Sequence, residues 1–129
     1  MRTLKHSANI VQVNGNSSDP TTTSTSYVEM PEMYAKFTTN GNPVLVLVHA
    51  VIEINTGESS NVAIAVDENV THYESIKVTI PDGYRANVTT FGVLYLDPGT
   101  YKIAAHWKTS AGTLRTMGID RTLTIMEVK

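Results

Sequence analysis

The sequence predicts an all-β fold, an antiparallel β-sandwich of the jelly-roll type with about eight strands. Valine and threonine are abundant along the chain, and both favour the pleated, half-buried surface of a sheet. Apolar residues gather nowhere in the roughly 3.6-residue period of an amphipathic helix. Turn-forming residues separate the extended segments, and no repeat of roughly 20 to 50 residues indicates a propeller or a solenoid.

Length and composition limit the classes of protein that fit. The 129 residues suit a single domain with one hydrophobic core. A net charge of -2 and the absence of any lysine or arginine run argue against nucleic acid and a membrane surface as partners. The chain has no cysteine, which excludes disulfides, thiolate metal sites and a cysteine nucleophile. The longest apolar run, residues 44–54, is much shorter than the roughly 20 residues of a membrane helix.

The composition changes at residue 26. Residues 1–26 contain one short candidate strand, residues 10–13, followed by a polar stretch rich in serine, threonine and asparagine. Such a stretch buries too little apolar surface to offset the entropy lost on ordering. We therefore expect residues 1–26 to form a flexible N-terminal arm, either a free tail or an arm that orders against a neighbouring protein. Residues 27–129 are expected to form the jelly-roll domain.

The first strands of the domain are expected at residues 27–30 and 34–39. Pro31 lies between them, and because proline cannot donate to a sheet ladder, it predicts an edge strand or a bend between two half-strands. Later in the chain, Asp97-Pro98-Gly99 predicts a type II turn in which glycine takes a positive φ.

The strand predicted at residues 44–54 is apolar on both faces. Under the two-residue alternation of a strand, one face carries Val44, Val46, Val48, Ala50, Ile52 and Ile54. The opposite face carries Leu45, Leu47 and Val51, with His49 as a hydrogen-bonded structural residue or a polar residue of an interface. A strand that is apolar on both faces must bury both, and without helices the obvious cover is another copy of the chain.

The last strand, residues 121–128, repeats this arrangement. Leu123 and Ile125 are expected to point inward, with Met126 and Val128 apolar on the opposite side. The predicted subunit interface therefore comprises Leu45, Leu47, His49, Val51, Met126 and Val128.

The strand predicted at residues 101–108 separates an aromatic face from a polar one. Trp107 shares a face with Tyr101 and Ile103, so we expect it in the core or at an interface. His106 lies on the other face and is expected in solvent.

No arrangement of residues predicts catalysis or a cofactor. The four histidines lie far apart and show no metal-ligand spacing. Asp67, Glu68 and Asp97 fall at strand ends, where carboxylates commonly cap turns, and nothing implies the cleft that paired catalytic carboxylates need. Oxygen ligands cluster at Asp67-Glu68-Asn69, but the EF-hand loop of a calcium site is missing. The sequence therefore leaves calcium binding undecided, and no metal ligand is predicted. Tyr73 and Tyr84 lie near loops and are the candidates for surface recognition.

Three stretches carry a family resemblance: TSTSYVEMPEMYAKFTTNGNPVLVLVHAVI, LDPGTYKIAAHWKTSAGTLRT and RTLTIMEVK. Their order and their pattern of core positions resemble the C1q/TNF-like jelly-roll domains of bacteriophage structural proteins, over residues 25–129. The resemblance implies a trimer in which one sheet of each protomer packs around a threefold axis. In related phage proteins such domains serve as capsid decoration proteins or as fibre heads that bind host surfaces. The resemblance carries over no catalytic residue.

The expected function is that of a non-enzymatic structural protein of the virion, assembled in the host cytoplasm. We expect a homotrimer that acts as a capsid decoration or minor virion component and contacts neighbouring virion proteins through residues 1–26. The alternative is the receptor-binding head of a tail fibre that recognises a host surface glycan or protein. A fibre head normally follows a long shaft, whereas only residues 1–26 precede the domain, which favours decoration.

Overall fold

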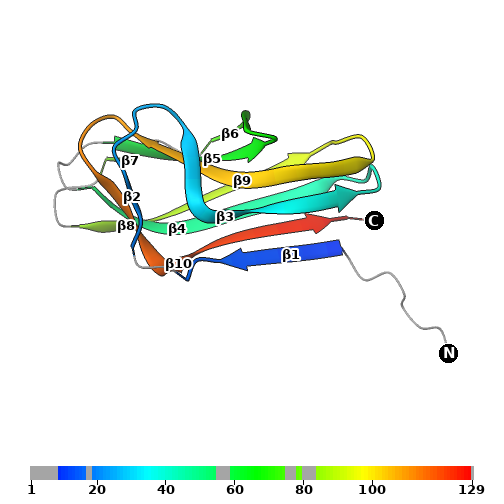
Figure 1. The fold of residues 1–129 in the computed structure, drawn as a ribbon, viewed down its shortest axis with the longest axis horizontal. Coiled ribbons are helices and arrows are strands. Elements are labelled where there is room, and N and C mark those ends of the chain that lie inside the picture. Colours follow the sequence, from blue (N-terminus) through cyan, green and yellow to red (C-terminus); the bar gives the residue numbers. More distant parts are fainter. Residues whose placement is uncertain (1–8, 17–18, 55–58, 75–77, 80–83, 129) are drawn as a thin grey trace.

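The computed structural model describes residues 9–16, 19–54, 59–74, 78–79 and 84–128, and the side chains of residues 71–74, 78, 79 and 119 lie outside this description. The described chain forms ten strands in two sheets that face each other as layers (Figure 1). One sheet has the order β1-β10-β4-β8, with β2 beside β10, and the other the order β3-β9-β5-β6, with β7 beside β5. The strands are β1 (Asn9–Asn14), β2 (Thr21–Thr22), β3 (Val28–Thr39), β4 (Val44–Ile54), β5 (Ser59–Val66), β6 (Asn69–Glu74), β7 (Val78–Thr79), β8 (Arg85–Leu94), β9 (Gly99–Thr109) and β10 (Leu114–Glu127).

The predicted fold class is confirmed. The described strand pairs are all antiparallel, and the chain passes repeatedly from one sheet to the other, as in a jelly roll. Within the described residues there is no helix long and apolar enough to cross a membrane.

The core lies between the two sheets and follows the predicted alternation. The even-numbered positions of β4, from Val44 to Ile54, are all buried. Ile103 and Trp107 of β9 pack against these residues from the other sheet. Trp107 was expected either in the core or at an interface, and the structure places it in the core. Burying a large apolar side chain contributes roughly 1.5 to 3 kcal/mol, so this layer is the main source of stability.

Strand β3 is an edge strand with an irregular middle. Its pairing with β9 shifts register between Glu29 and Tyr34, a segment that contains Pro31, and Glu32 has a φ of 68°. The predictions drawn from Pro31, an edge position and a bend, are both confirmed. Where residues 27–30 and 34–39 were expected as two strands, the structure has one strand with a bulge, because β9 pairs with both halves.

The turn after β8 differs from its prediction. Gly99 has a positive φ, as expected, but its value of 156° is far from the roughly 80° that this position of a type II turn requires. Gly99 instead begins β9 and pairs with Thr39.

The described part of residues 1–26 belongs to the sandwich. Strand β1 pairs with β10 from Asn9 opposite Glu127 to Asn14 opposite Thr122. At its end, a Cβ added to Gly15 would lie 2.3 Å from the carbonyl oxygen of Gly118, so only glycine lets the chain approach β10 this closely. The candidate strand at residues 10–13 is present as the edge strand β1, although residues 1–26 as a whole were expected as a flexible arm. Residues 1–8 lie outside the described residues.

Candidate functional site

The outward face of the sheet β1-β10-β4-β8 carries the candidate site. In β4 the inward residues are buried, while Leu45, Leu47, His49 and Val51 point outward and are half-buried or exposed. Leu47 is 38% exposed. The sequence prediction of two apolar faces on this strand is therefore confirmed in its geometry.

A shallow apolar groove lies at the centre of this face. It has a volume of about 220 Å³ and is lined by Leu45, Leu47, Phe91, Thr124 and Met126. The sheet register explains the grouping, because Leu47 lies directly between Phe91 of β8 and Thr124 of β10, and Leu45 lies opposite Met126. Side chains opposite each other on neighbouring strands point to the same face and touch.

The apolar surface continues on both sides of the groove. Val93 pairs with Leu45 from β8, and Ile10 pairs with Met126 from β1. Phe91 and Ile10 are each 55% exposed, which is unusual for such large apolar side chains when they are grouped. We call this surface the outer apolar face and define it as Ile10, Leu45, Leu47, Phe91, Val93, Met126 and Val128.

Four of the six predicted interface residues, Leu45, Leu47, Met126 and Val128, lie on the outer apolar face. His49 and Val51 point outward from the same strand but have polar neighbours. His49 lies between Thr89 and Thr122, and Val51 lies opposite Asn87.

Beyond Val51 the face becomes charged. Glu53 is bound by two arginines, with Arg115 Nη2 at 2.8 Å from Oε1 and Arg85 Nε at 3.3 Å from Oε2. The sheet surface thus has an apolar end and a charged end. A partner that covers the apolar end alone leaves the charged groups in solvent.

Phe91, Val93 and Ile10 are the residues of this face that the sequence prediction did not include. The alternation in residues 87–96 does place Phe91 and Val93 on a common face. Phe91, Val93 and Ile10 belong to the outer apolar face because β8 pairs with β4 and β1 pairs with β10. The alternation within one strand does not determine which strands pair.

Of the two candidates for surface recognition, only Tyr84 has a described side chain. Tyr84 is 67% exposed just before β8, as expected for a residue near a loop. Tyr73 belongs to β6, but its side chain lies outside the described residues.

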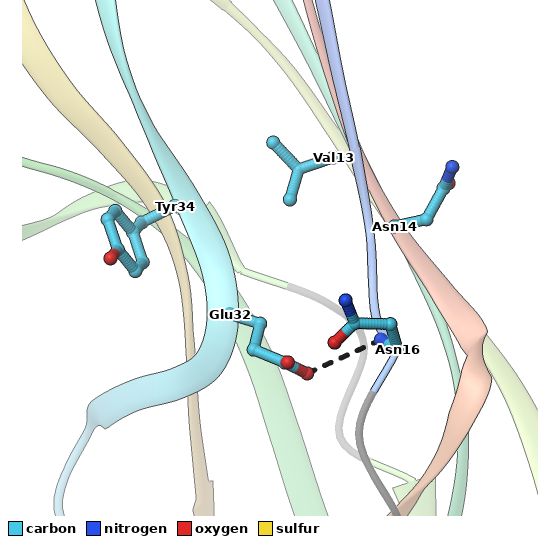
Figure 2. Close-up of a pocket in the computed structure, with 5 residues that line it drawn as sticks. All are labelled: Val13, Asn14, Asn16, Glu32 and Tyr34. Atoms are coloured by element: carbon cyan, nitrogen blue, oxygen red, sulfur yellow. Dashed lines mark hydrogen bonds between the residues drawn. The ribbon is translucent and has the colours of Figure 1, made fainter.

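A polar pocket of about 510 Å³ lies between β1 and β3, lined by Val13, Asn14, Asn16, Glu32 and Tyr34. Figure 2 shows the Glu32 carboxylate turned toward the backbone of Asn16, whose amide donates to it at 3.4 Å. The same carboxylate accepts a hydrogen bond from the fully buried Arg121. A buried guanidinium requires a counter-charge, so Glu32 is engaged in holding the two sheets together.

A buried carboxylate, that of Glu127, lies at the other end of β10. Oε2 of Glu127 accepts hydrogen bonds from Thr39 Oγ1 and from the amides of Asn40 at 2.7 Å and Asn42 at 3.2 Å. The hydrogen bond from Thr39 has the largest effect, and together these bonds hold the pKa of Glu127 below its ordinary value. Glu127 therefore fastens the β3–β4 turn to the last strand.

His106 points to the outward face of its sheet, as predicted, but it is buried where exposure to solvent was expected. It points away from the core on β9 and is nevertheless only 4% exposed. Ala63 and Ala104, themselves buried, form the floor beside it, and Glu29 lies opposite on β3. Burial lowers the pKa of His106. The expectation of a solvent-exposed histidine is wrong, because the outward face of this sheet is partly covered.

The sequence matches no protein-family model, and no curated protein matches it. Solved structures with the same fold include Eiger TNF from S. frugiperda, with a TM-score of 0.66 at 10% identity over 95% of this chain and 93% of that chain. Murine APRIL at pH 5.0 has a TM-score of 0.62 at 11% identity, covering 95% and 100% of the two chains. The infectious bursal disease virus VP2 subviral particle has a TM-score of 0.60 at 10% identity over 95% of this chain, which spans 33% of that protein.

At these identities the likeness is one of fold. The chain is a jelly roll similar to those of TNF proteins and of a protein that forms a viral particle. The candidate functional feature of this chain is the outer apolar face on the sheet β1-β10-β4-β8.

Proposed function

We propose that the protein is a non-enzymatic structural component of a bacteriophage particle, a homotrimer that serves as a capsid decoration or minor virion protein. The observation that carries this proposal is the outer apolar face. Grouped and exposed apolar side chains of this size mark an interaction surface, and the described part of the chain provides no cover for it.

The occupant that we propose is a second copy of the same chain. The resemblance to C1q/TNF-like phage domains supports this choice, because it implies that one sheet of each protomer packs around a threefold axis. The fold likeness to Eiger TNF and APRIL agrees with that arrangement. An apolar surface bordered at one end by the charged residues Glu53, Arg85 and Arg115 is compatible with the apolar core and polar periphery of a protein–protein interface.

The place in a virion rests on the same resemblance, with further support from the fold likeness to a viral particle protein. The outer apolar face would be used to build the trimer, which leaves the opposite sheet and the loops to meet neighbouring virion proteins.

The receptor-binding head of a tail fibre is the second candidate, favoured by the exposed aromatic ring of Tyr84. An exposed aromatic face can stack on a sugar ring, and the tyrosine hydroxyl adds a polar contact. A glycan array probed with the protein and with Tyr84→Ala separates the two roles. Binding that is lost in Tyr84→Ala favours the fibre head, and an array without binding together with tight binding to capsids favours decoration.

The trimer is tested by light scattering of the purified protein at micromolar concentration. The proposal requires a mass of three times the 14.1 kDa of the chain. A stable monomer at this concentration would contradict it.

A further inference from the structure

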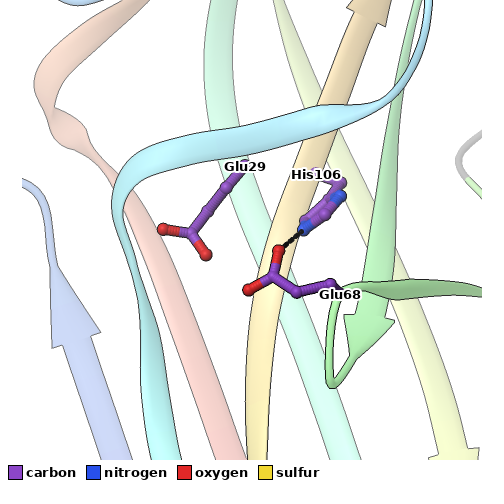
Figure 3. A group of neighbouring side chains, drawn as sticks. All are labelled: Glu29, Glu68 and His106. Carbon is purple, nitrogen blue, oxygen red and sulfur yellow. Dashed lines mark ion pairs between the residues drawn. The ribbon is translucent and has the colours of Figure 1, made fainter.

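Three side chains that bind metals elsewhere in proteins meet on the outward face of the other sheet (Figure 3). Glu29 comes from β3, Glu68 from the turn between β5 and β6, and His106 from β9. One donor atom of each lies within 4.8 Å of the other two. Glu29 and His106 are directly opposite each other in the β3–β9 register, so two of the three donors are fixed by sheet pairing.

Glu68 is brought to the other two by its turn. Asp67 and Glu68 both have positive φ, 49° and 69°, between the paired residues Val66 and Asn69, which is the geometry of a two-residue type I′ hairpin. Asp67 is anchored to β9, since its amide donates to the Lys102 carbonyl at 2.8 Å and its Oδ1 accepts from the Lys102 amide at 2.9 Å. The turn therefore holds the Glu68 side chain over β9.

His106 is the observation that points to a ligand. Its side chain is 5% exposed, and neither ring nitrogen has a hydrogen-bond partner among the described residues. Nε2 faces the carboxylate of Glu68, with Oε2 at 3.7 Å, as Figure 3 shows. Buried polar groups are almost always hydrogen-bonded, and this imidazole instead directs an unused nitrogen at two carboxylates.

Lys102 holds the two carboxylates together. Its Nζ lies 2.6 Å from Glu29 Oε1 and 2.6 Å from Glu68 Oε1, and the hydrogen bond that it donates to Glu29, above all, raises the pKa of Lys102. The ammonium therefore compensates one of the two negative charges and leaves the imidazole without a hydrogen-bond partner among the described residues. In this same position the Nζ lies 5.0 Å from the centre of the Tyr34 ring, so a lysine that releases the carboxylates can stay in a favourable contact with that ring.

We propose that Glu29, Glu68 and His106 form a binding site for a divalent transition-metal ion of the zinc class, with Lys102 turning toward Tyr34 as the metal enters. One imidazole nitrogen and two carboxylate oxygens are a zinc-type donor set, whereas calcium and magnesium prefer oxygen ligands alone. The donor atoms must approach one another to reach zinc bonds of about 2 Å. Once Lys102 releases it, the side chain of Glu68, which is 58% exposed, can make most of that movement.

The bound metal joins β3, the β5–β6 turn and β9. Because a metal that binds the folded chain stabilises it by mass action, the thermal midpoint rises with metal concentration. The site lies on the sheet opposite the outer apolar face, so it does not depend on the proposed trimer.

Zinc titration of the metal-free protein, by calorimetry and by thermal unfolding, tests the site. One zinc ion per chain is expected to bind and to raise the unfolding temperature. His106→Gln and Glu68→Gln should each weaken zinc binding by more than about tenfold, because changing even a residue that only supports a metal ligand costs about that much. Asp97→Asn, which removes an exposed carboxylate elsewhere, is the matched control and should bind zinc as the parent does.

Lys102→Met distinguishes a metal site from a cluster that has only a structural role. If the ammonium competes with the metal for the two carboxylates, its removal should tighten zinc binding, whereas a purely structural cluster would only lose stability. Circular dichroism checks that each variant is folded, and Glu68→Gln, at an exposed side chain, keeps the test decisive should His106→Gln unfold. The proposal is overturned by an absence of zinc binding, by equal affinity in Glu68→Gln and the parent, or by tighter binding of calcium than of zinc.

Discussion

The substitution Leu47→Asp probes the centre of the outer apolar face. Leu47 is 38% exposed in the chain itself, so in a monomer the new carboxylate meets water and the free energy of unfolding changes by at most about 1 kcal/mol, the span of strand propensities. Under a second copy, the same carboxylate is buried without a counter-charge among Leu45, Phe91 and Met126. Such a charge costs about 3 to 5 kcal/mol, or roughly a hundredfold or more in association for each protomer.

Sedimentation velocity over a series of concentrations measures this loss. The parent protein should stay assembled where Leu47→Asp is monomeric, with the same far-ultraviolet circular dichroism. Val28→Asp is the matched control, because Val28 is 36% exposed and lies in β3 of the other sheet. Assembly of Leu47→Asp like that of the parent, or dissociation of Val28→Asp as ready as that of Leu47→Asp, would contradict a buried position of Leu47 in the assembly.

Three further predictions concern the free energy of unfolding, which is measured for each variant and the parent by urea denaturation. Glu32→Gln removes the carboxylate that faces buried Arg121 and should cost about 3 kcal/mol; an unchanged midpoint would contradict that role. Gly15→Ala drives a Cβ against the Gly118 carbonyl and should cost about 1 to 3 kcal/mol, so a neutral result would mean that β1 is free to move. Because the pKa of Glu127 is lowered from 4.5, its contribution is complete above that pH and is lost as the pH falls through the native value. Glu127→Gln should therefore destabilise the protein at pH 7 and lose its effect in acid, and an equal effect at both pH values would refute the assignment.

The alternation of residues 44–54 was enough to predict β4, its buried face and its outward face. Two-residue periodicity fixes which side chains share a face, and the assignments of Leu45 and Leu47 follow from it. The same periodicity cannot say which strands lie next to each other. Phe91 and Ile10 join the outer apolar face only because β8 and β1 are its flanking strands.

His106 illustrates a second limit of the sequence. Its outward direction was predicted correctly, but an outward residue is exposed only if nothing covers the sheet. The irregular edge strand β3 and the β5–β6 turn place Glu29 and Glu68 beside it, and both features arise from tertiary pairing. No spacing in the sequence brings these three residues together.

The closing strand shows a third limit. Arg121 and Glu127 occupy inward positions in register with Leu123 and Ile125, where a pattern-based reading expects apolar side chains. The partner of Arg121 is Glu32 in the bulge of β3, and the partners of Glu127 lie in the β3–β4 turn. Buried charges of this kind are explained only when the opposite sheet is in place.

The central claim, that the outer apolar face is covered by another copy of the chain, is tested most directly by thiol labelling. The chain has no cysteine, so Phe91→Cys introduces a unique thiol on the face and Val28→Cys a unique thiol on the other sheet. Because Phe91 is 55% exposed in the chain alone, a monomer would label quickly at both positions. If another copy covers the face, Phe91→Cys should label slowly and become fast on dilution, whereas Val28→Cys should label fast at every concentration. Fast labelling of Phe91→Cys at every concentration would contradict it.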